Sequence, residues 1–235
     1  MVRTFRKRGS SYRGQTMKIY QSLSPHFNER LLPIDSIIIH YTDMPTAEEA
    51  LHWLCQPHSQ VSAHYLIDEK GKIYHIVPEE KRAWHAGQSY WQGCKDMNSC
   101  SVGIELANPG HSHGYQPFPE AQIDSLVTLC KTLQVRWDIP SSRVLGHSDI
   151  APQRKQDPGH LFPWDLLAKE GVGLWAKQLL EGKKIDANEA LKKIGYETVS
   201  PSHALLAFQR HFQPQKVDGV ANHQTYSLLQ GLLNV

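Results

Sequence analysis

The chain has 235 residues, a net charge of +2, 40% apolar residues and 20% charged residues. This composition is typical of a soluble globular protein with room for one catalytic domain and a small second domain. The charge is too small for a nucleic-acid-binding surface, so we expect no nucleic-acid partner. No stretch reaches the roughly 18 apolar residues that a transmembrane segment needs.

The sequence predicts that residues 1–30 form a basic N-terminal tail and lead-in. No apolar run of signal-peptide length follows the basic residues. The simplest interpretation is a disordered or vector-derived tail. The alternatives are a tail that binds the envelope or a partner, and a true start at Met17. The basic residues are Arg3, Arg6, Lys7, Arg8 and Arg13.

The sequence predicts that residues 31–178 form the main, catalytic domain, which contains five strands. The continuous apolar run before His40 is typical of a strand that is buried on both faces. The alternation in residues 101–106 places Glu105 on the face opposite Val102 and Ile104. The predicted strands are residues 37–40, 63–68, 72–77, 101–106 and 144–147, and the second and third form a hairpin.

Helical patterns separate these strands. Thr46, with Glu49 three residues later, predicts a capping box at a helix start. Apolar residues at three- and four-residue steps after Pro119 predict a long amphipathic helix. A further helix starts near Pro163 and ends before Gly171. We therefore predict an α/β (mixed α+β) fold, with a central mixed sheet flanked by helices.

The pattern changes after Trp175, and residues 185–235 predict a small C-terminal three-helix domain. A polar linker at residues 181–184 precedes it. About fifty residues make a marginal core on their own, so we expect this domain to dock on the main domain. Its predicted helices are residues 187–194, 202–211 and 222–233.

The four cysteines contain no C-x-x-C pair, which argues against a structural zinc knuckle. Cys94 and Cys100 flank a polar loop and could close a short disulfide in an exported protein. Cys55 and Cys130 lie in apolar helical patterns and are expected to be buried thiols.

The segment from Val144 to Gly159 places His147 and Asp157 close together in the sequence, and His40 ends a strand far upstream. Two imidazoles and one carboxylate can form a hydrolytic zinc site whose fourth position stays open for water. Each residue alone is a weak candidate, because lone histidines are commonly capping or exposed residues and an aspartate before proline commonly forms a turn. Their shared position at strand exits or ordered turns makes the set our starting hypothesis.

Two further residues suggest a mechanism. Glu105 is the candidate general base, and the alternative is a solvent-exposed carboxylate. Lys155 projects to the same side as Asp157 if the segment before Pro158 is extended. Its ammonium could then stabilise an oxyanion, and the alternative is a solvated lysine.

Five separated motifs together resemble a known family: I-I-I-H-Y-T, V-S-A-H-Y-L-I, R-A-W-H-A-G, S-V-G-I-E-L and G-H-S-D-I-A-P-Q-R-K-Q-D-P-G. In this order they are similar to the zinc-dependent N-acetylmuramoyl-L-alanine amidases of the AmpD/AmiD type (amidase type 2), which are relatives of a phage lysozyme and of the peptidoglycan recognition proteins. The resemblance covers roughly residues 35–175. The C-terminal helices resemble the peptidoglycan-binding domain of AmiD-like members.

The resemblance implies a role for each site residue. His40, His147 and Asp157 match the zinc ligands, Glu105 the catalytic glutamate and Lys155 the lysine that stabilises the transition state.

Five other residues are expected to bind substrate: Tyr41, His64, Trp84, His85 and Asn108. For His64 a purely structural role is an equal alternative, and for Trp84 apolar packing is the alternative. His111 and His113 match no motif and are expected to be exposed.

The resemblance implies hydrolysis of the amide bond between the lactyl group of N-acetylmuramic acid, or its anhydro form, and L-alanine of the stem peptide. It implies one Zn²⁺ per chain and peptidoglycan or muropeptides as partners, and we expect a monomer. The alternatives are a zinc-dependent cell-wall peptidase, a non-catalytic muropeptide-binding protein and a metal-free Cys/His hydrolase. A wall-binding tail favours the cell envelope, whereas the missing signal peptide and the AmpD likeness favour the cytoplasm. We expect the envelope.

Overall fold

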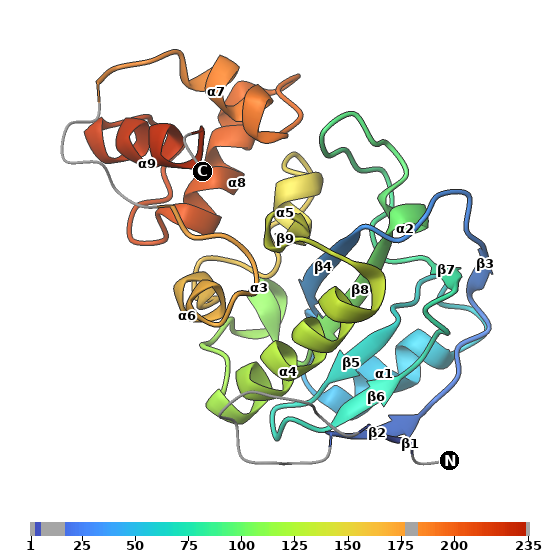
Figure 1. The fold of residues 1–235 in the computed structure, drawn as a ribbon. Helices are drawn as coiled ribbons and strands as arrows, with labels where there is room; N and C mark the ends of the chain where they lie inside the picture. Colours follow the sequence, from blue (N-terminus) through green and yellow to red (C-terminus); the bar gives the residue numbers. More distant parts are fainter. Residues whose placement is uncertain (1–2, 6–16, 177–182, 234–235) are drawn as a thin grey trace.

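The computed structural model describes residues 3–5, 17–176 and 183–233 (Figure 1). Seven strands within these residues form one mixed sheet. In spatial order they are β1 (Arg3–Phe5), β2 (Met17–Gln21), β6 (Ile73–His75), β5 (Tyr65–Ile67), β8 (Ser101–Leu106), β4 (Ser36–Tyr41) and β9 (Val144–Gly146). A separate antiparallel pair consists of β3 (Phe27–Glu29) and β7 (Lys81–Ala83). The predicted fold class is confirmed.

The strands that will carry the site are parallel neighbours. β4 pairs in parallel with β8 on one side and with β9 on the other. β5 and β6 are antiparallel, which confirms the predicted hairpin with shorter strands. β9 ends at Gly146, one residue earlier than predicted, and His147 begins a helix.

The sheet also extends into the segment that we predicted as a lead-in. β2 pairs in parallel with β6, and β1 pairs antiparallel with β2. A main domain that starts at residue 31 is therefore too short, because the backbone of residues 17–21 supplies ladder hydrogen bonds to β6.

Helices cover both faces of this sheet. α4 lies across one face and α1 across the opposite face (Figure 1). The helices of the main domain are α1 (Ala47–Cys55), α2 (Met97–Cys100), α3 (Gly110–His113), α4 (Glu120–Trp137), α5 (His147–Ile150) and α6 (Trp164–Lys169), with the 3-10 turn η1 (Ser141–Arg143). Thr46 caps α1 as predicted, since its hydroxyl accepts from the backbone N–H of Glu49 at 3.1 Å.

The burial of β4 explains its continuous apolar sequence. Ile37 and Ile39 belong to the core between the sheet and α4, whereas Ile38 belongs to a second core on the opposite face. All six residues of β4 are buried. A strand that is covered on both faces needs an apolar residue at almost every position.

The C-terminal helices are α7 (Ala187–Ile194), α8 (Pro201–Phe212) and α9 (His223–Leu233). Figure 1 shows them beside α5, and α8 contacts α5 directly. Phe208 and Leu229 share one apolar cluster with Ile38 and Leu145 of the sheet. The three helices therefore complete their core against the main domain.

The cysteines are free thiols in the described part of the chain. The sulfur atoms of Cys94 and Cys100 lie 3.5 Å apart. Cys130 is buried as predicted, whereas Cys55 is only partly buried. Within the described residues, no helix combines the length and apolar character that a membrane crossing requires.

Candidate metal and active site

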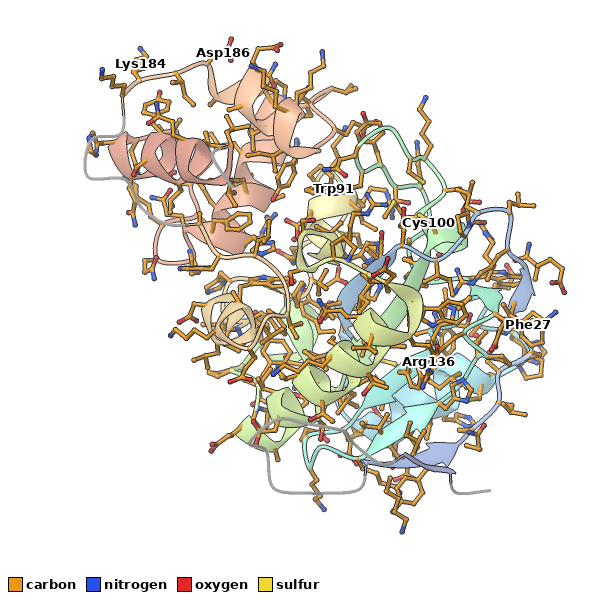
Figure 2. The ribbon with its side chains drawn as sticks, viewed as in Figure 1. Phe27, Trp91, Cys100, Arg136, Lys184 and Asp186 are labelled. Atoms are coloured by element: carbon orange, nitrogen blue, oxygen red, sulfur yellow. The ribbon has the colours of Figure 1, made fainter. Side chains whose placement is uncertain are left out.

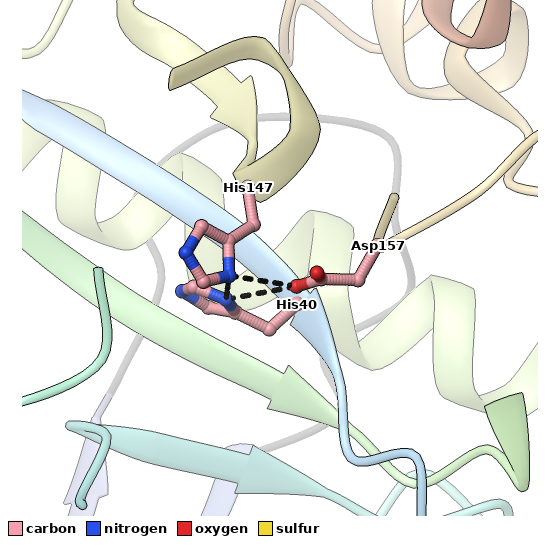
Figure 3. Close-up of side chains that lie close together, drawn as sticks. All are labelled: His40, His147 and Asp157. Carbon is pink, nitrogen blue, oxygen red and sulfur yellow. Dashed lines mark hydrogen bonds and ion pairs between the residues drawn. The ribbon is translucent and has the colours of Figure 1, made fainter. Parts of the chain in front are cut away.

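The three predicted metal ligands converge at one point beside the sheet (Figure 3). His40 lies near the carboxyl end of β4, His147 follows β9, and Asp157 lies on the loop after α5. Nδ1 of His40 lies 2.9 Å from Nδ1 of His147 and 3.1 Å from Oδ2 of Asp157. Nδ1 of His147 lies 3.0 Å from the same oxygen. The carboxyl ends of parallel strands thus bring together residues that are far apart in the sequence.

Hydrogen bonds behind the two imidazoles orient them towards this point. Nε2 of His147 lies 3.1 Å from the carbonyl oxygen of Ala86, so Nε2 carries a proton and Nδ1 is the nitrogen that faces the other two ligands. Nε2 of His40 lies 3.0 Å from Nδ1 of His85. Nε2 of His85 in turn lies 3.3 Å from the hydroxyl of Ser101. Such partners behind the ligands fix the tautomer that a metal requires.

The electrostatics keep these groups in their metal-binding protonation states. Burial, and then the neighbouring His147, lowers the pKa of His40 to about 4, so its ring is neutral at pH 7. Burial alone would raise the pKa of Asp157, but His147 and His40 outweigh it and hold that pKa well below its usual range. The group therefore contains a neutral imidazole at His40 and a carboxylate anion at Asp157.

This donor set fits a divalent zinc ion. Ligand atoms about 2.1 Å from a tetrahedral ion lie about 3.4 Å from one another, which is within a few tenths of an ångström of the spacing here. Two imidazole nitrogens and a carboxylate oxygen that face one another in a buried place form a donor set for a cation. His40, His147 and Asp157 can therefore bind a metal ion.

Glu105 faces the same place from the neighbouring strand. It is the register partner of His40 in the β4–β8 pair, on the face opposite Val102 and Ile104 as predicted. Its Oε2 is buried and has no hydrogen-bond partner. Burial, and then the charge of Asp157, raises the pKa of Glu105 well above its ordinary value. A carboxylate with a free oxygen beside a metal-binding group is suited to move protons.

One cleft of about 310 Å³ contains the metal-binding group and Glu105. Lys155 lines it as well. Three of the predicted substrate-binding residues, Tyr41, Trp84 and His85, also line this cleft.

Two residues that we expected to bind substrate lie outside the cleft. His64 is fully buried, and its Nδ1 accepts from the backbone N–H of Gly103 at 2.9 Å. Asn108 is also buried and donates to the carbonyl of Gln116 at 2.8 Å. Because both side chains are occupied by backbone groups, the expectation of direct substrate contact is corrected for His64 and Asn108.

Three further residues near the site make contacts that the sequence did not indicate. Arg30 donates to backbone carbonyls at the end of α2, those of Ser99 within the helix at 2.8 Å and of Ser101 just after it at 2.9 Å. Arg154 lines the cleft and donates at 3.0 Å to the carbonyl of Ala86. His111 is exposed as predicted, and its Nδ1 lies 2.7 Å from the hydroxyl of Tyr41. These partners lie 68 to 71 residues away in the sequence, so no local spacing could have identified them.

The comparisons with known proteins agree with this geometry. The sequence model of a family described as N-acetylmuramoyl-L-alanine amidase matches residues 30–160. The chain is 37% identical over 231 residues to the N-acetylmuramoyl-L-alanine amidase AmiD of Escherichia coli, covering 85% of this chain and 82% of that protein. It is 35% identical over 165 residues to the 1,6-anhydro-N-acetylmuramyl-L-alanine amidase AmpD of Haemophilus influenzae, covering 62% and 88%.

Two solved structures resemble the whole chain. The complex of Escherichia coli AmiD with anhydro-N-acetylmuramic acid-L-Ala-D-gamma-Glu-L-Lys has a TM-score of 0.77 and 32% identity, covering 89% of this chain and 97% of that one. The complex of Pseudomonas aeruginosa AmpDh3 with anhydromuramic pentapeptide has a TM-score of 0.78 and 28% identity, covering 97% of both chains. The matched residues 30–160 contain all three of the side chains that can bind a metal. The chain therefore belongs to the N-acetylmuramoyl-L-alanine amidase family and is an amidase of that kind.

Proposed function

We propose that the chain is a zinc amidase that cuts between the lactyl group of a muramic acid residue and L-alanine of the stem peptide. The observation that carries this proposal is one cleft in which three metal-binding atoms lie beside the unpartnered oxygen of Glu105. The two similar proteins solved with anhydro-muropeptides support this class of substrate.

In the proposed mechanism, His40, His147 and Asp157 would hold the zinc ion. When bound, zinc would polarise the scissile carbonyl and lower the pKa of water. Glu105 takes a proton from the attacking water at its free carboxylate oxygen and returns it to the departing amine. The ammonium of Lys155 stabilises the negative oxygen of the tetrahedral intermediate. Tyr41, Trp84 and His85 form the part of the cleft that orients the sugar and peptide.

Metal analysis combined with product analysis tests this function. Purified protein should contain about one zinc per chain and should release peptides with a free L-alanine amino terminus. Mass spectrometry should detect them after incubation with intact sacculi or with soluble anhydro-muropeptide. Cleavage only at bonds within the peptide would favour the cell-wall peptidase, and binding without turnover would favour the non-catalytic muropeptide-binding protein. Activity that survives chelation would favour the Cys/His hydrolase.

We also propose that residues 185–235 bind peptidoglycan and that the protein acts as a monomer in the cell envelope. Support for the first assignment comes from the complex of Pseudomonas aeruginosa AmpDh3 with anhydromuramic pentapeptide, which covers 97% of this chain and so extends over its C-terminal helices. The full-length variant Glu105→Gln should sediment with sacculi without digesting them. Light scattering should give the mass of a single chain of 26.7 kDa. Failure to sediment, or a larger mass, would contradict these two assignments.

A further inference from the structure

A buried polar cluster joins the C-terminal helices to the short helix that carries a metal ligand. It consists of Asp149 in α5, Tyr196 after α7 and His211 in α8. Their exposed fractions are 1%, 1% and 3%. Asp149 follows the metal ligand His147 by only two residues. Buried polar groups of this kind persist where their hydrogen bonds are satisfied, so the partners of Asp149 define what the cluster does.

The carboxylate of Asp149 forms hydrogen bonds with both the main domain and the C-terminal domain. Oδ2 of Asp149 accepts from the backbone N–H of Gly146 at 2.7 Å and closes the first turn of α5. The same oxygen lies 2.8 Å from Nδ1 of His211, and Oδ1 accepts from the hydroxyl of Tyr196 at 2.7 Å. The start of α5 and two residues of the C-terminal domain are thus connected through one side chain.

The two C-terminal partners are themselves fixed by packing. The ring of His211 stacks on Trp164 at 3.9 Å between centroids. Trp91, at the same junction in Figure 2, meets Tyr196 edge to face at 5.0 Å. The backbone N–H of Gln92 donates to the carbonyl of Gly195 at 3.0 Å. The hydrogen bonds to Asp149 therefore come from groups with little freedom to move.

The backbone of α5 positions two of the three metal-binding side chains. His147 is its first residue, and the backbone N–H of Ser148 donates to the carbonyl of Asp157 at 2.9 Å. A shift of α5 would therefore move the imidazole of His147 and the loop of Asp157 together. Since α5 has only four residues, its own hydrogen bonds cannot hold it in place.

We propose that Asp149 is a positioning residue and that Tyr196 and His211 make the C-terminal domain part of the support of the metal site. The C-terminal helices then have a second role besides wall binding, because they hold α5 in the orientation that aims His147 at the metal. This inference rests on the zinc site of the proposed function. It concerns metal affinity, which can be measured without turnover.

The test compares the zinc affinity of full-length variants in competition with a chelating dye. Tyr196→Phe removes one hydroxyl, and Tyr226→Phe in α9 is the matched control, because its hydroxyl has no contact with Asp149. Loss of a side chain that hydrogen-bonds directly to a metal ligand weakens metal binding by about 10- to 100-fold. Because Asp149 acts on His147 through the backbone of α5, we expect Asp149→Ala near the lower end of this range and a smaller loss in Tyr196→Phe. Asp149→Asn should lie between them, because its amide keeps one acceptor oxygen.

Circular dichroism should establish that each variant is folded at the temperature of the titration. A purely structural role would lower the melting temperature of Tyr196→Phe and leave its zinc affinity equal to that of Tyr226→Phe. That result would overturn the inference. A wild-type protein that binds no zinc would instead refute the proposed function, so the two failures are distinguishable.

Discussion

Replacing Glu105 with glutamine should affect turnover and stability in opposite directions. The substitution keeps the shape of the side chain but removes its charge and its proton-accepting oxygen. In the wild type Oε2 is buried without a hydrogen-bond partner, and burial, followed by the charge of Asp157, raises the pKa of this group. The carboxylate therefore costs folding free energy that Glu105→Gln should recover.

General acid–base catalysis contributes about 10²- to 10⁴-fold to a rate. At about 1.4 kcal/mol for each tenfold, Glu105→Gln should raise the activation barrier by about 3–5 kcal/mol. The sign of the change in folding stability follows from the difference between the pKa values of the folded and unfolded states. A carboxyl whose pKa is raised by folding destabilises the folded state at pH values above its unfolded pKa of about 4.3. The metal-free variant should be more stable than the wild type at pH 7, by about 1–2 kcal/mol. The difference should vanish as the pH falls below about 4, where both states are protonated.

Two measurements check this reasoning. Steady-state turnover should be followed on a muropeptide with zinc content measured for each sample. Urea unfolding should be carried out in the presence of a chelator at pH 7 and near pH 4. Turnover within threefold of the wild type at full zinc content would remove Glu105 from the chemistry. An equal stability difference at both pH values would show that the charge of Glu105 carries no burial cost.

Three other substitutions have distinct expected results. His147→Ala should abolish both zinc binding and turnover, and added zinc should not restore them; retained stoichiometric zinc in metal analysis would contradict this. Lys155→Met should keep zinc and lower kcat by about 10²- to 10³-fold, with partial recovery in Lys155→Arg, because the positive charge stabilises the oxyanion; equal kcat in both variants would remove the charge from the mechanism. Glu79→Ala should lower the free energy of unfolding by about 3 kcal/mol in chemical denaturation, because this buried carboxylate accepts from Tyr65, Arg136 and Trp137. A loss below 1 kcal/mol would show that these hydrogen bonds are replaced by water.

The central strands could be predicted from the sequence because their burial imposes a simple pattern. The apolar run that ends at His40 predicts a strand covered on both faces, and β4 is buried at each position. The alternation in residues 101–106 predicts that Glu105 and Ile104 point to opposite faces, and the structure confirms this. Period and burial are local properties, so a single sequence contains them.

The metal-binding group was predictable only in part. A histidine at a strand end and an aspartate before a proline are common without a metal, and spacing gives each of them little weight. Their shared position at strand exits or ordered turns makes His40, His147 and Asp157 a hypothesis, and the family resemblance implies their role as ligands. The structure places their ligand atoms within 4.8 Å of one another.

Contacts between remote segments could not be predicted. Arg30 looks like one more basic residue in a lead-in, yet its guanidinium donates to carbonyls up to 71 residues away. The motif V-S-A-H-Y-L-I makes His64 a candidate groove residue, yet its ring is fully buried and its Nδ1 accepts from the backbone N–H of Gly103. Such pairings follow no repeat along the chain, so only the folded backbone reveals them.

The position of β4 between β8 and β9 also determines when the three ligand side chains can come together during biosynthesis. His40 and His147 are separated by 107 residues, so the ligand set is incomplete until residue 157 has left the ribosome. The nascent chain must close these long loops before it gains any binding energy from an ion. An ion held by all three side chains would therefore stabilise the topology in which β4 and β9 are paired.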